Sequence, residues 1–162
     1  MLRFKKKPRT IKVTMKRRRQ DTYETAYITK VYVWSNKTDS AGRHVEKRTQ
    51  CIFDTGNLVG NFVSKSFLVE ELGVQESEFN REGLTETEKS GESASGHPVI
   101  PEGWIELTWH PHNCAMPYRN MRFLVLENPK FELTICARTI EQHKILSKPF
   151  YLTSISEAHG KF

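Results

Sequence analysis

The sequence predicts a single, mostly β domain with a few short helices. At 162 residues the chain suits one domain with its own core and is short for two. The expected elements run in the order strand, strand, helix, strand, strand, strand, helix, with no internal repeat. We expect residues 1–20 to form a basic arm without fixed structure, residues 21–148 the folded domain, and residues 149–162 a C-terminal segment that serves as a tail or a strand at a dimer interface.

The first two strands are expected to form a hairpin. Residues 22–34 alternate between β-branched or aromatic residues and the other face of a strand, as is typical of a half-buried strand. The polar, turn-rich stretch 35–43 (SNKTDSAGR) then connects to a second strand from His44 to Phe53. That strand ends in the apolar triplet Cys51-Ile52-Phe53.

A short helix is expected after the second strand. Ser64 is a candidate N-cap, and Phe67, Leu68 and Leu72 share one helical face before Gly73 ends it. Residues 70–92 carry eight acidic residues against two basic ones, so we expect this stretch to run over the surface.

The second half of the chain predicts three strands and a last helix. Residues 104–109 place Ile105, Leu107 and Trp109 on one face, residues 113–120 read as a turn, and residues 121–126 and 131–135 are apolar strands. Thr139 with Gln142 resembles a capping box for a helix that runs to Ile145.

The charge of the chain is segregated. Residues 1–20 contain ten lysines and arginines and no acidic residue, whereas the remainder holds 15 basic against 19 acidic residues, a net charge of −4. Such an arm is either a solvated tail or a segment that binds nucleic acid or acts as a nuclear localisation signal, and composition alone does not separate these readings. We expect that deleting it would abolish nucleic-acid binding and leave the stability of the domain unchanged.

Membrane, metal and disulfide chemistry find little support. No apolar run approaches the roughly 20 residues of a spanning helix, and we expect no membrane partner. Three widely spaced cysteines favour a reducing, intracellular setting, in the cytoplasm or nucleus. His110, His112 and Cys114 read as a polar turn rather than a metal site, Cys51 as a buried thiol, and the three tryptophans as core or interface residues. We expect no metal and no cofactor, since the glycine-containing stretch 91–96 lacks the lysine of a phosphate loop.

The sharpest motif is Asp54-Thr55-Gly56. By itself the triplet predicts only a turn. Here it follows an apolar strand end, so the turn would aim a carboxylate out of the strand, and an apolar pair and a helix-capping serine follow.

From this motif onward the sequence resembles the retropepsin-like aspartic proteases of retroviruses and retrotransposons. The resemblance covers residues 23–146: the hairpin into Asp54-Thr55-Gly56, the stretch Asn61-Phe62-Val63-Ser64, a glycine-containing segment at 91–96, the stretch 99–107, and the apolar stretch 131–140. It implies a small closed antiparallel β barrel. It also implies a peptide-bond hydrolase that needs two carboxylates.

Because the chain holds one such motif, the resemblance implies a homodimer in which each copy supplies Asp54 as the catalytic residue. Thr55, Gly56 and Asn57 would complete the active-site turn, with Thr55 bonding across the dimer. A flap would close over a peptide substrate. Its residues would be Ser93, Ala94, Ser95, Gly96 and His97.

Two positions depart from the family pattern. Asn57 stands where the family has alanine or serine and is expected beside the catalytic floor, and Cys136 stands where a glycine is usual and is expected to crowd the loop beneath the turn. They leave open an alternative: a catalytically impaired dimerisation or binding module with a basic nucleic-acid-binding arm. A nucleic-acid-binding barrel without protease chemistry fits less well, because the body is net acidic.

Overall fold

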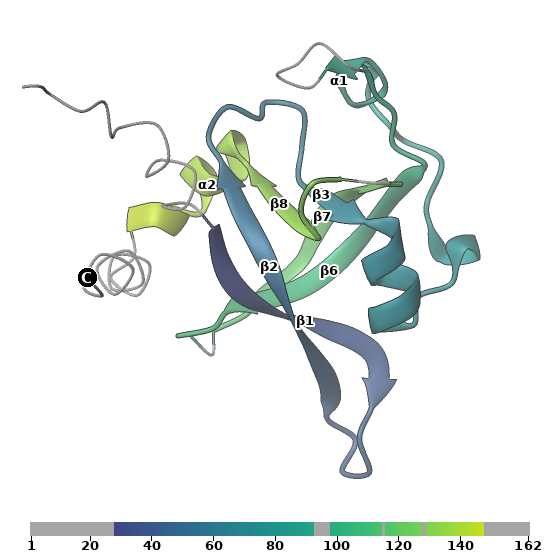
Figure 1. Cartoon of the computed structure of the whole chain (residues 1–162), viewed down its shortest axis with the longest axis vertical. Helices are drawn as coiled ribbons and strands as arrows, with labels where there is room; N and C mark the ends of the chain where they lie inside the picture. Colours follow the sequence, from purple (N-terminus) through teal and green to yellow (C-terminus); the bar gives the residue numbers. More distant parts are fainter. Residues whose placement is uncertain (1–27, 93–97, 115, 128, 148–162) are drawn as a thin grey trace, which may run out of the picture.

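Six strands close into a barrel in the order β1-β2-β8-β3-β7-β6 (Figure 1). The structure, a computed structural model, describes residues 28–92, 98–114, 116–127 and 129–147. Its strands are β1(Ile28–Thr38), β2(His44–Asp54), β3(Phe62–Ser64), β4(Gly91–Glu92), β5(Pro98–Val99), β6(Gly103–Pro111), β7(Tyr118–Leu126) and β8(Leu133–Cys136). Its helices and helical turns are η1(Phe67–Leu72), η2(Glu76–Glu78), α1(Glu86–Lys89), α2(Ala137–Gln142) and η3(Ile145–Ser147).

The expected fold class, a small closed β barrel with short helices, is confirmed. Four of the pairings between barrel strands are antiparallel, whereas β2 with β8 and β3 with β7 are parallel. The barrel is therefore mixed rather than wholly antiparallel. The parallel pairing has a functional consequence, because it brings the end of β2 beside the end of β8.

The expected hairpin is confirmed, with a longer first strand. β1 continues past Trp34 through an irregularity to Thr38, which pairs with His44, so residues 35–38 belong to the strand and not to the connection. The turn itself is closed by Asp39, whose Oδ1 accepts the backbone N–H groups of Ala41 and Arg43 at 2.9 Å each. The hairpin projects from the barrel at the bottom of Figure 1. Residues 22–27 of the expected strand lie outside the described residues.

The helix after β3 follows the expectation in its buried face and its end, whereas the residue that precedes it is Ser66 and not the expected cap Ser64. Phe67, Leu68 and Leu72 are buried, and the Ser64 hydroxyl accepts the backbone N–H of Phe67 at 3.4 Å. The helix is a π-helical turn, and Gly73 ends it in the left-handed conformation (φ 72°).

The acidic stretch 70–92 runs over the surface as expected, but it is anchored at three buried apolar residues, Leu72, Val74 and Phe79. It also contains the helix α1, which the sequence analysis did not predict. Thr85 and Glu88 form its capping box.

The last helix begins earlier than expected. Thr139 was expected to cap it, but α2 starts at Ala137 directly after β8, and Thr139 lies inside it. The reason is a tertiary contact: the Ala137 N–H donates to the Asn57 carbonyl at 3.0 Å, so the chain turns as soon as β8 ends. A separate helical turn, η3, then holds the buried Ile145.

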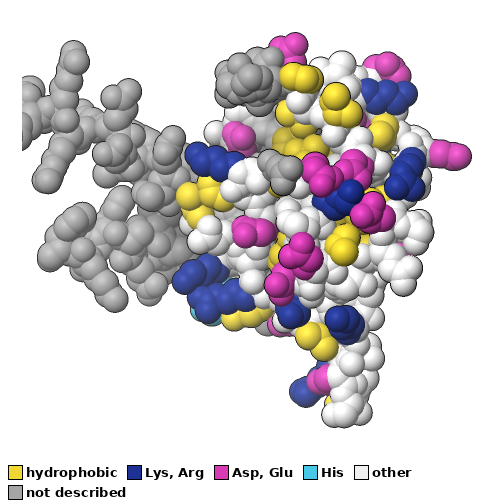
Figure 2. Space-filling view, turned by 45° about the vertical axis from the view of Figure 1, so that its right-hand side comes forward, with side chains coloured by type: hydrophobic (Ala, Val, Ile, Leu, Met, Phe, Trp, Pro, Cys, Tyr) yellow, Lys and Arg dark blue, Asp and Glu magenta, His cyan; other side chains and the backbone are white. Residues whose placement is uncertain are grey.

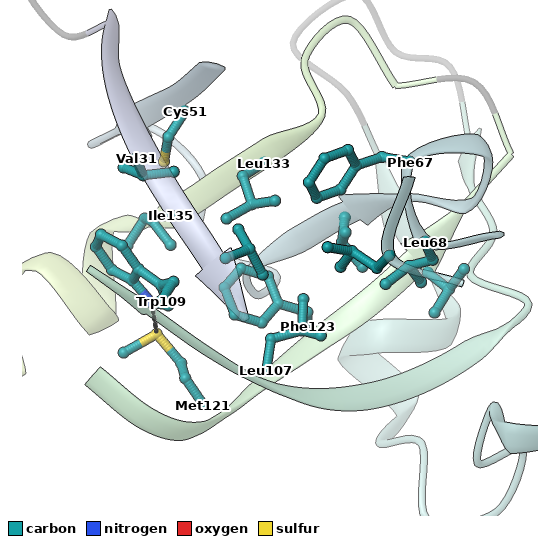
Figure 3. Packing of buried hydrophobic residues seen from close by; sticks show 14 of the residues in the cluster. Val31, Cys51, Phe67, Leu68, Leu107, Trp109, Met121, Phe123, Leu133 and Ile135 are labelled. Atoms are coloured by element: carbon teal, nitrogen blue, oxygen red, sulfur yellow. Dashed lines mark hydrogen bonds between the residues drawn. The ribbon is translucent and has the colours of Figure 1, made fainter. Parts of the chain in front are cut away.

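The core fills the barrel between β1, β2, β6, β7, β8 and η1 (Figure 3). Trp109 is its largest fully buried side chain, and its indole N–H donates to the Met121 sulfur at 3.2 Å. Trp109 therefore serves the core, as expected, whereas Trp34 and Trp104 are only partly buried.

The cysteines are free thiols, and Cys51 is fully buried, which raises its pKa. A thiol held in its protonated form is a poor nucleophile, in line with the expected buried thiol. No helix in the part of the chain that the structure describes is long and apolar enough to cross a membrane.

Candidate active site

Asp54 is the last residue of β2, and its side chain is held in a turn at the barrel end. Its Oδ1 accepts the backbone N–H of Gly56 at 3.0 Å, and its carbonyl oxygen accepts the N–H of Asn57 at 3.2 Å. Asp54 is half-buried, while Thr55 and Gly56 are exposed. A local hydrogen bond thus fixes one carboxylate oxygen, while the other accepts no hydrogen bond from the residues that the structure describes.

Gly56 leaves the exposed side of the Asp54 turn without a side chain. A Cβ placed on Gly56 would meet Asp54 Oδ1 at 3.4 Å, an ordinary contact, so packing within the single chain does not force glycine here. The missing side chain instead leaves the carboxylate open to an approaching backbone. That Thr55 bonds across a dimer stays a prediction, since the structure contains one chain.

We expected the Asn57 side chain to lie beside the catalytic carboxylate, but the structure shows it pointing elsewhere. Its side chain is buried and turns back into the following loop. The amide Nδ2 donates to the Gly60 carbonyl at 2.8 Å, and Oδ1 accepts the N–H of Val59 at 2.9 Å. Asn57 therefore acts as an internal brace for residues 57–60.

Cys136 does not crowd the turn either. Parallel pairing sets it opposite Asp54, in an extended conformation (φ −77°, ψ 162°) that any residue adopts, so no glycine is needed. Its thiol lies 3.4 Å from the Thr139 hydroxyl. The departure from the family pattern is thus accommodated without strain.

Asn61 is a positioning residue that the sequence analysis quoted without giving it a role. It is buried, its Oδ1 accepts the Cys136 backbone N–H at 3.0 Å, and its Nδ2 donates to the Arg122 carbonyl at 3.0 Å. The side chain therefore links β7 to the start of α2 beside the Asp54 turn. The only sequence signal is a polar residue directly before an apolar strand, which is weak.

The strands on either side of the expected flap, β4 and β5, pair with each other as a hairpin. Gly91 pairs with Val99 and Glu92 with Pro98, while the expected flap residues 93–97 lie outside the described residues. A Cβ on Gly91 would come within 3.0 Å of both methyl groups of Val59, so the hairpin base packs tightly on the loop that follows Asp54. The hairpin is therefore joined to the candidate site.

Apolar side chains border this region. Leu58 is 69% exposed and Ile100 is 71% exposed, one on the loop after Asp54 and the other just after β5. Both side chains are therefore accessible to another molecule.

Arg122 and Glu88 form an ion pair, which we call the clamp, that fixes the chain just before the hairpin of β4 and β5. Arg122 donates to both carboxylate oxygens of Glu88, at 3.2 and 3.1 Å, and to the Gly83 carbonyl at 3.0 Å. The guanidinium also lies over the Trp104 ring, 4.0 Å from its centroid. This clamp holds α1, and with it the start of β4, against the barrel.

Because the clamp depends on an ionised Glu88, we expect α1 to become less stable in acid. Partial burial alone would raise the pKa of Glu88, but the Thr85 N–H and the Arg122 guanidinium outweigh it and hold the pKa below its usual value of 4.5. A lowered folded-state pKa stabilises the fold above pH 4.5 and loses that contribution as the pH falls through the folded-state value. We expect the protection of the amides of residues 85–90, that is, their exchange rate relative to the intrinsic rate at the same pH, to fall in that range. In Glu88→Gln the acid-dependent step should vanish, and an unchanged step would contradict the clamp.

The stretch from His110 to Cys114, expected to be a polar turn, is one only in part: His110 lies in β6, and the turn covers His112 and Asn113. The His110 Nδ1 lies 2.8 Å from the Cys114 carbonyl, and its Nε2 lies 3.2 Å from Glu46. Within the described ranges no group of three or more histidine, cysteine, aspartate or glutamate side chains is placed to hold a metal ion.

Comparisons with known proteins give a distant likeness among solved structures. No protein-family model matches the chain, and no curated protein matches it. Among solved structures it is similar to the retroviral protease-like domain of Ddi1 from Leishmania major, with 15% sequence identity and a TM-score of 0.38 over 72% of this chain and 79% of that one. The fold assignment therefore rests on the barrel described above.

Proposed function

We propose that this chain is an aspartic endopeptidase that hydrolyses peptide bonds as a homodimer, with one Asp54 from each copy. One observation carries the proposal: a half-buried carboxylate fixed by the Gly56 N–H where the apolar end of β2 meets two exposed residues, on a loop that packs against a hairpin. A reaction at this carboxylate needs such an arrangement, in which one oxygen is held and the neighbouring surface is open.

The chemistry explains why a second copy is needed. One carboxylate must take a proton from the attacking water as its oxygen bonds to the scissile carbonyl carbon. A second, protonated, must donate to the carbonyl oxygen. The tetrahedral intermediate then collapses as a proton passes to the leaving nitrogen and the C–N bond breaks. Asp54 has no recorded contact with another carboxylate among the described residues, so the second must come from a partner.

Two facing carboxylates would titrate as a unit. Like charges at short range disfavour double ionisation, so the pair would share one proton, and the rate would follow a bell-shaped pH profile on the mildly acidic side. The exposed apolar residues Leu58 and Ile100 suit a dimer or an extended, mainly apolar peptide as the contacting molecule.

The alternative of an impaired binding module rested on Asn57 and Cys136. Both are accommodated within the fold, as a loop brace and as an ordinary strand end. Neither residue gives a reason to prefer the module over the enzyme.

The proposal is tested by the concentration dependence of hydrolysis. With a fluorogenic library of extended peptides, we expect activity per chain to rise with protein concentration until the dimer is saturated. The dimer should appear over the same range in sedimentation measurements. Activity per chain that stays constant while the protein sediments as a monomer would refute the shared site, and no hydrolysis by the saturated dimer would refute the enzyme.

A further inference from the structure

A surface that runs from β1 to the edge of the candidate active site, where Asn61 and Cys136 also line its groove, combines aromatic rings with cations. It lies on the outer side of β1, with neighbours on β2, β6 and β7, and continues to the end of α2. We call it the ring-and-cation surface. It comprises Tyr32, Trp34, His44, His110, His112, Arg119, Arg138 and His143.

Trp34 stands at the centre of the first half of this surface. Its indole stacks on the His44 imidazole, with ring centroids 4.9 Å apart and planes inclined by 17°. The Arg119 guanidinium lies over the same indole, 5.0 Å from its centroid. Trp34 is only partly buried, whereas His44 and Arg119 are exposed. An aromatic ring thus stands at the surface between two basic side chains.

Tyr32 repeats the arrangement two residues earlier on β1. Its ring stacks with His110 and His112 of the neighbouring segment, with centroids 5.3 and 5.6 Å apart. Tyr32 and Trp34 point to the same face because strand side chains alternate. The rings are therefore arranged in a row along one strand.

Glu46 holds the two halves of the row in register. Its Oε1 accepts the Trp34 indole N–H at 3.1 Å and lies 3.2 Å from the His110 Nε2. Fixed rings lose less conformational entropy when a ligand stacks on them.

The row continues into a groove of about 590 Å³ at the end of the barrel. Arg119 belongs to both, and Arg138 and His143 line the groove further on. Among the described residues Arg138 has no recorded ion-pair partner, in contrast to Arg122, which Glu88 neutralises. The groove therefore presents uncompensated positive charge.

The net charge of −4 for the residues after the arm does not show that part of the chain is basic. The stretch 70–92 alone carries eight acidic against two basic residues, so the rest of the chain after residue 20 holds 13 basic and 11 acidic residues. Figure 2 shows acidic and basic side chains mixed over the middle and right of one face, and a group of Lys and Arg side chains at its lower left edge.

We propose that the ring-and-cation surface binds single-stranded nucleic acid. Because His44 and Arg119 lie against the Trp34 indole, a base would stack on the exposed His44 imidazole or take the place of the Arg119 guanidinium, which would then contact a phosphate. An acidic peptide would use the cations but not the rings. The ten cations of residues 1–20 would add phosphate contacts of their own.

The test measures binding of a fluorescein-labelled uridine oligonucleotide of about 12 residues, a length that suits one barrel, to the full chain by anisotropy. The double variant Tyr32→Leu/Trp34→Leu keeps every charge and the arm. We expect it to bind about tenfold more weakly or worse, because stacking contributes roughly 1–3 kcal/mol per base. Its salt dependence should stay as in the parent.

A charge-matched pair checks the cations. Arg119→Glu should weaken binding and lower the salt slope by about 0.7 for the lost phosphate contact. Arg81→Glu makes the same charge change in the acidic stretch and should bind as the parent does. Equal losses in both, or an undiminished ring variant, would overturn the proposal. So would competition by polyglutamate as strong as that by unlabelled oligonucleotide.

Cross-linking tests the proposal on the unaltered protein, in case the variant Tyr32→Leu/Trp34→Leu does not fold. A 4-thiouridine oligonucleotide irradiated with the unaltered protein should cross-link to peptides spanning residues 30–34 or 108–112. Cross-links confined to residues 1–20 would assign all binding to the arm and refute the surface.

Discussion

Replacing Asp54 by asparagine should abolish peptide hydrolysis and leave the fold intact. The amide can neither accept the proton of the attacking water nor share a proton with its partner, and general acid–base catalysis alone is worth about 10²–10⁴ in rate. The asparagine Oδ1 can still accept the Gly56 N–H that now goes to the carboxylate at 3.0 Å. We therefore expect a loss of at least about a hundredfold in kcat with an unchanged thermal transition.

Asp39→Asn is a matched control. Asp39 also accepts backbone N–H groups through Oδ1 in a turn, but that turn lies at the hairpin tip between β1 and β2. This variant should retain parental activity. If Asp54→Asn also hydrolyses peptides at the parental rate, the aspartic mechanism is wrong.

Mixing the two proteins tests whether the site is shared. Random assembly of equal amounts of parent and Asp54→Asn chains gives about one quarter parental dimers. If a single ionisable pair spans the interface, the mixture should keep about one quarter of the activity that the same total of parent chains shows. A mixture that retains half would mean that each chain works alone.

The second large effect is expected at Asn57, and it is a loss rather than a gain. Asn57→Ala would remove the donor to the Gly60 carbonyl and the acceptor of the Val59 N–H in a partly buried loop. Leaving such groups unsatisfied costs about 1–3 kcal/mol. We expect the free energy of unfolding in urea to fall by about that amount, with no rise in hydrolysis.

Asn36→Ala serves as the comparison, because Asn36 makes an exposed hydrogen bond to Glu78 and its loss should change stability little. If Asn57→Ala kept full stability and gained activity, the sequence-based expectation that Asn57 obstructs the catalytic floor would be right and the brace seen in the structure would be unimportant. Adding Cys136→Gly should destabilise further, since glycine raises the chain entropy of the unfolded state at a position that does not need it.

The structure does not show the effects that the sequence suggested for Asn57, beside the catalytic floor, and for Cys136, crowding the loop beneath the turn. A side chain's size is visible in the sequence, but its direction is not. Asn57 turns inward because backbone groups of residues 59 and 60 lie within reach of its amide. Cys136 fits because its φ is negative. Both depend on the path of the loop, which the sequence alone did not reveal.

The sequence by itself determined the elements whose signals are local. Alternation along β1, the apolar end of β2 before Asp54, the buried face of η1 and the stop at Gly73 all follow from nearest neighbours and were predicted. Tertiary structure alone decided the parallel pairing of Asp54 with Cys136, the early start of α2 and the stacking of His110 on Tyr32 and of His44 on Trp34. Each of these joins residues distant in the chain, and the physical reason is that closing the barrel, not local propensity, sets which strands and side chains become neighbours.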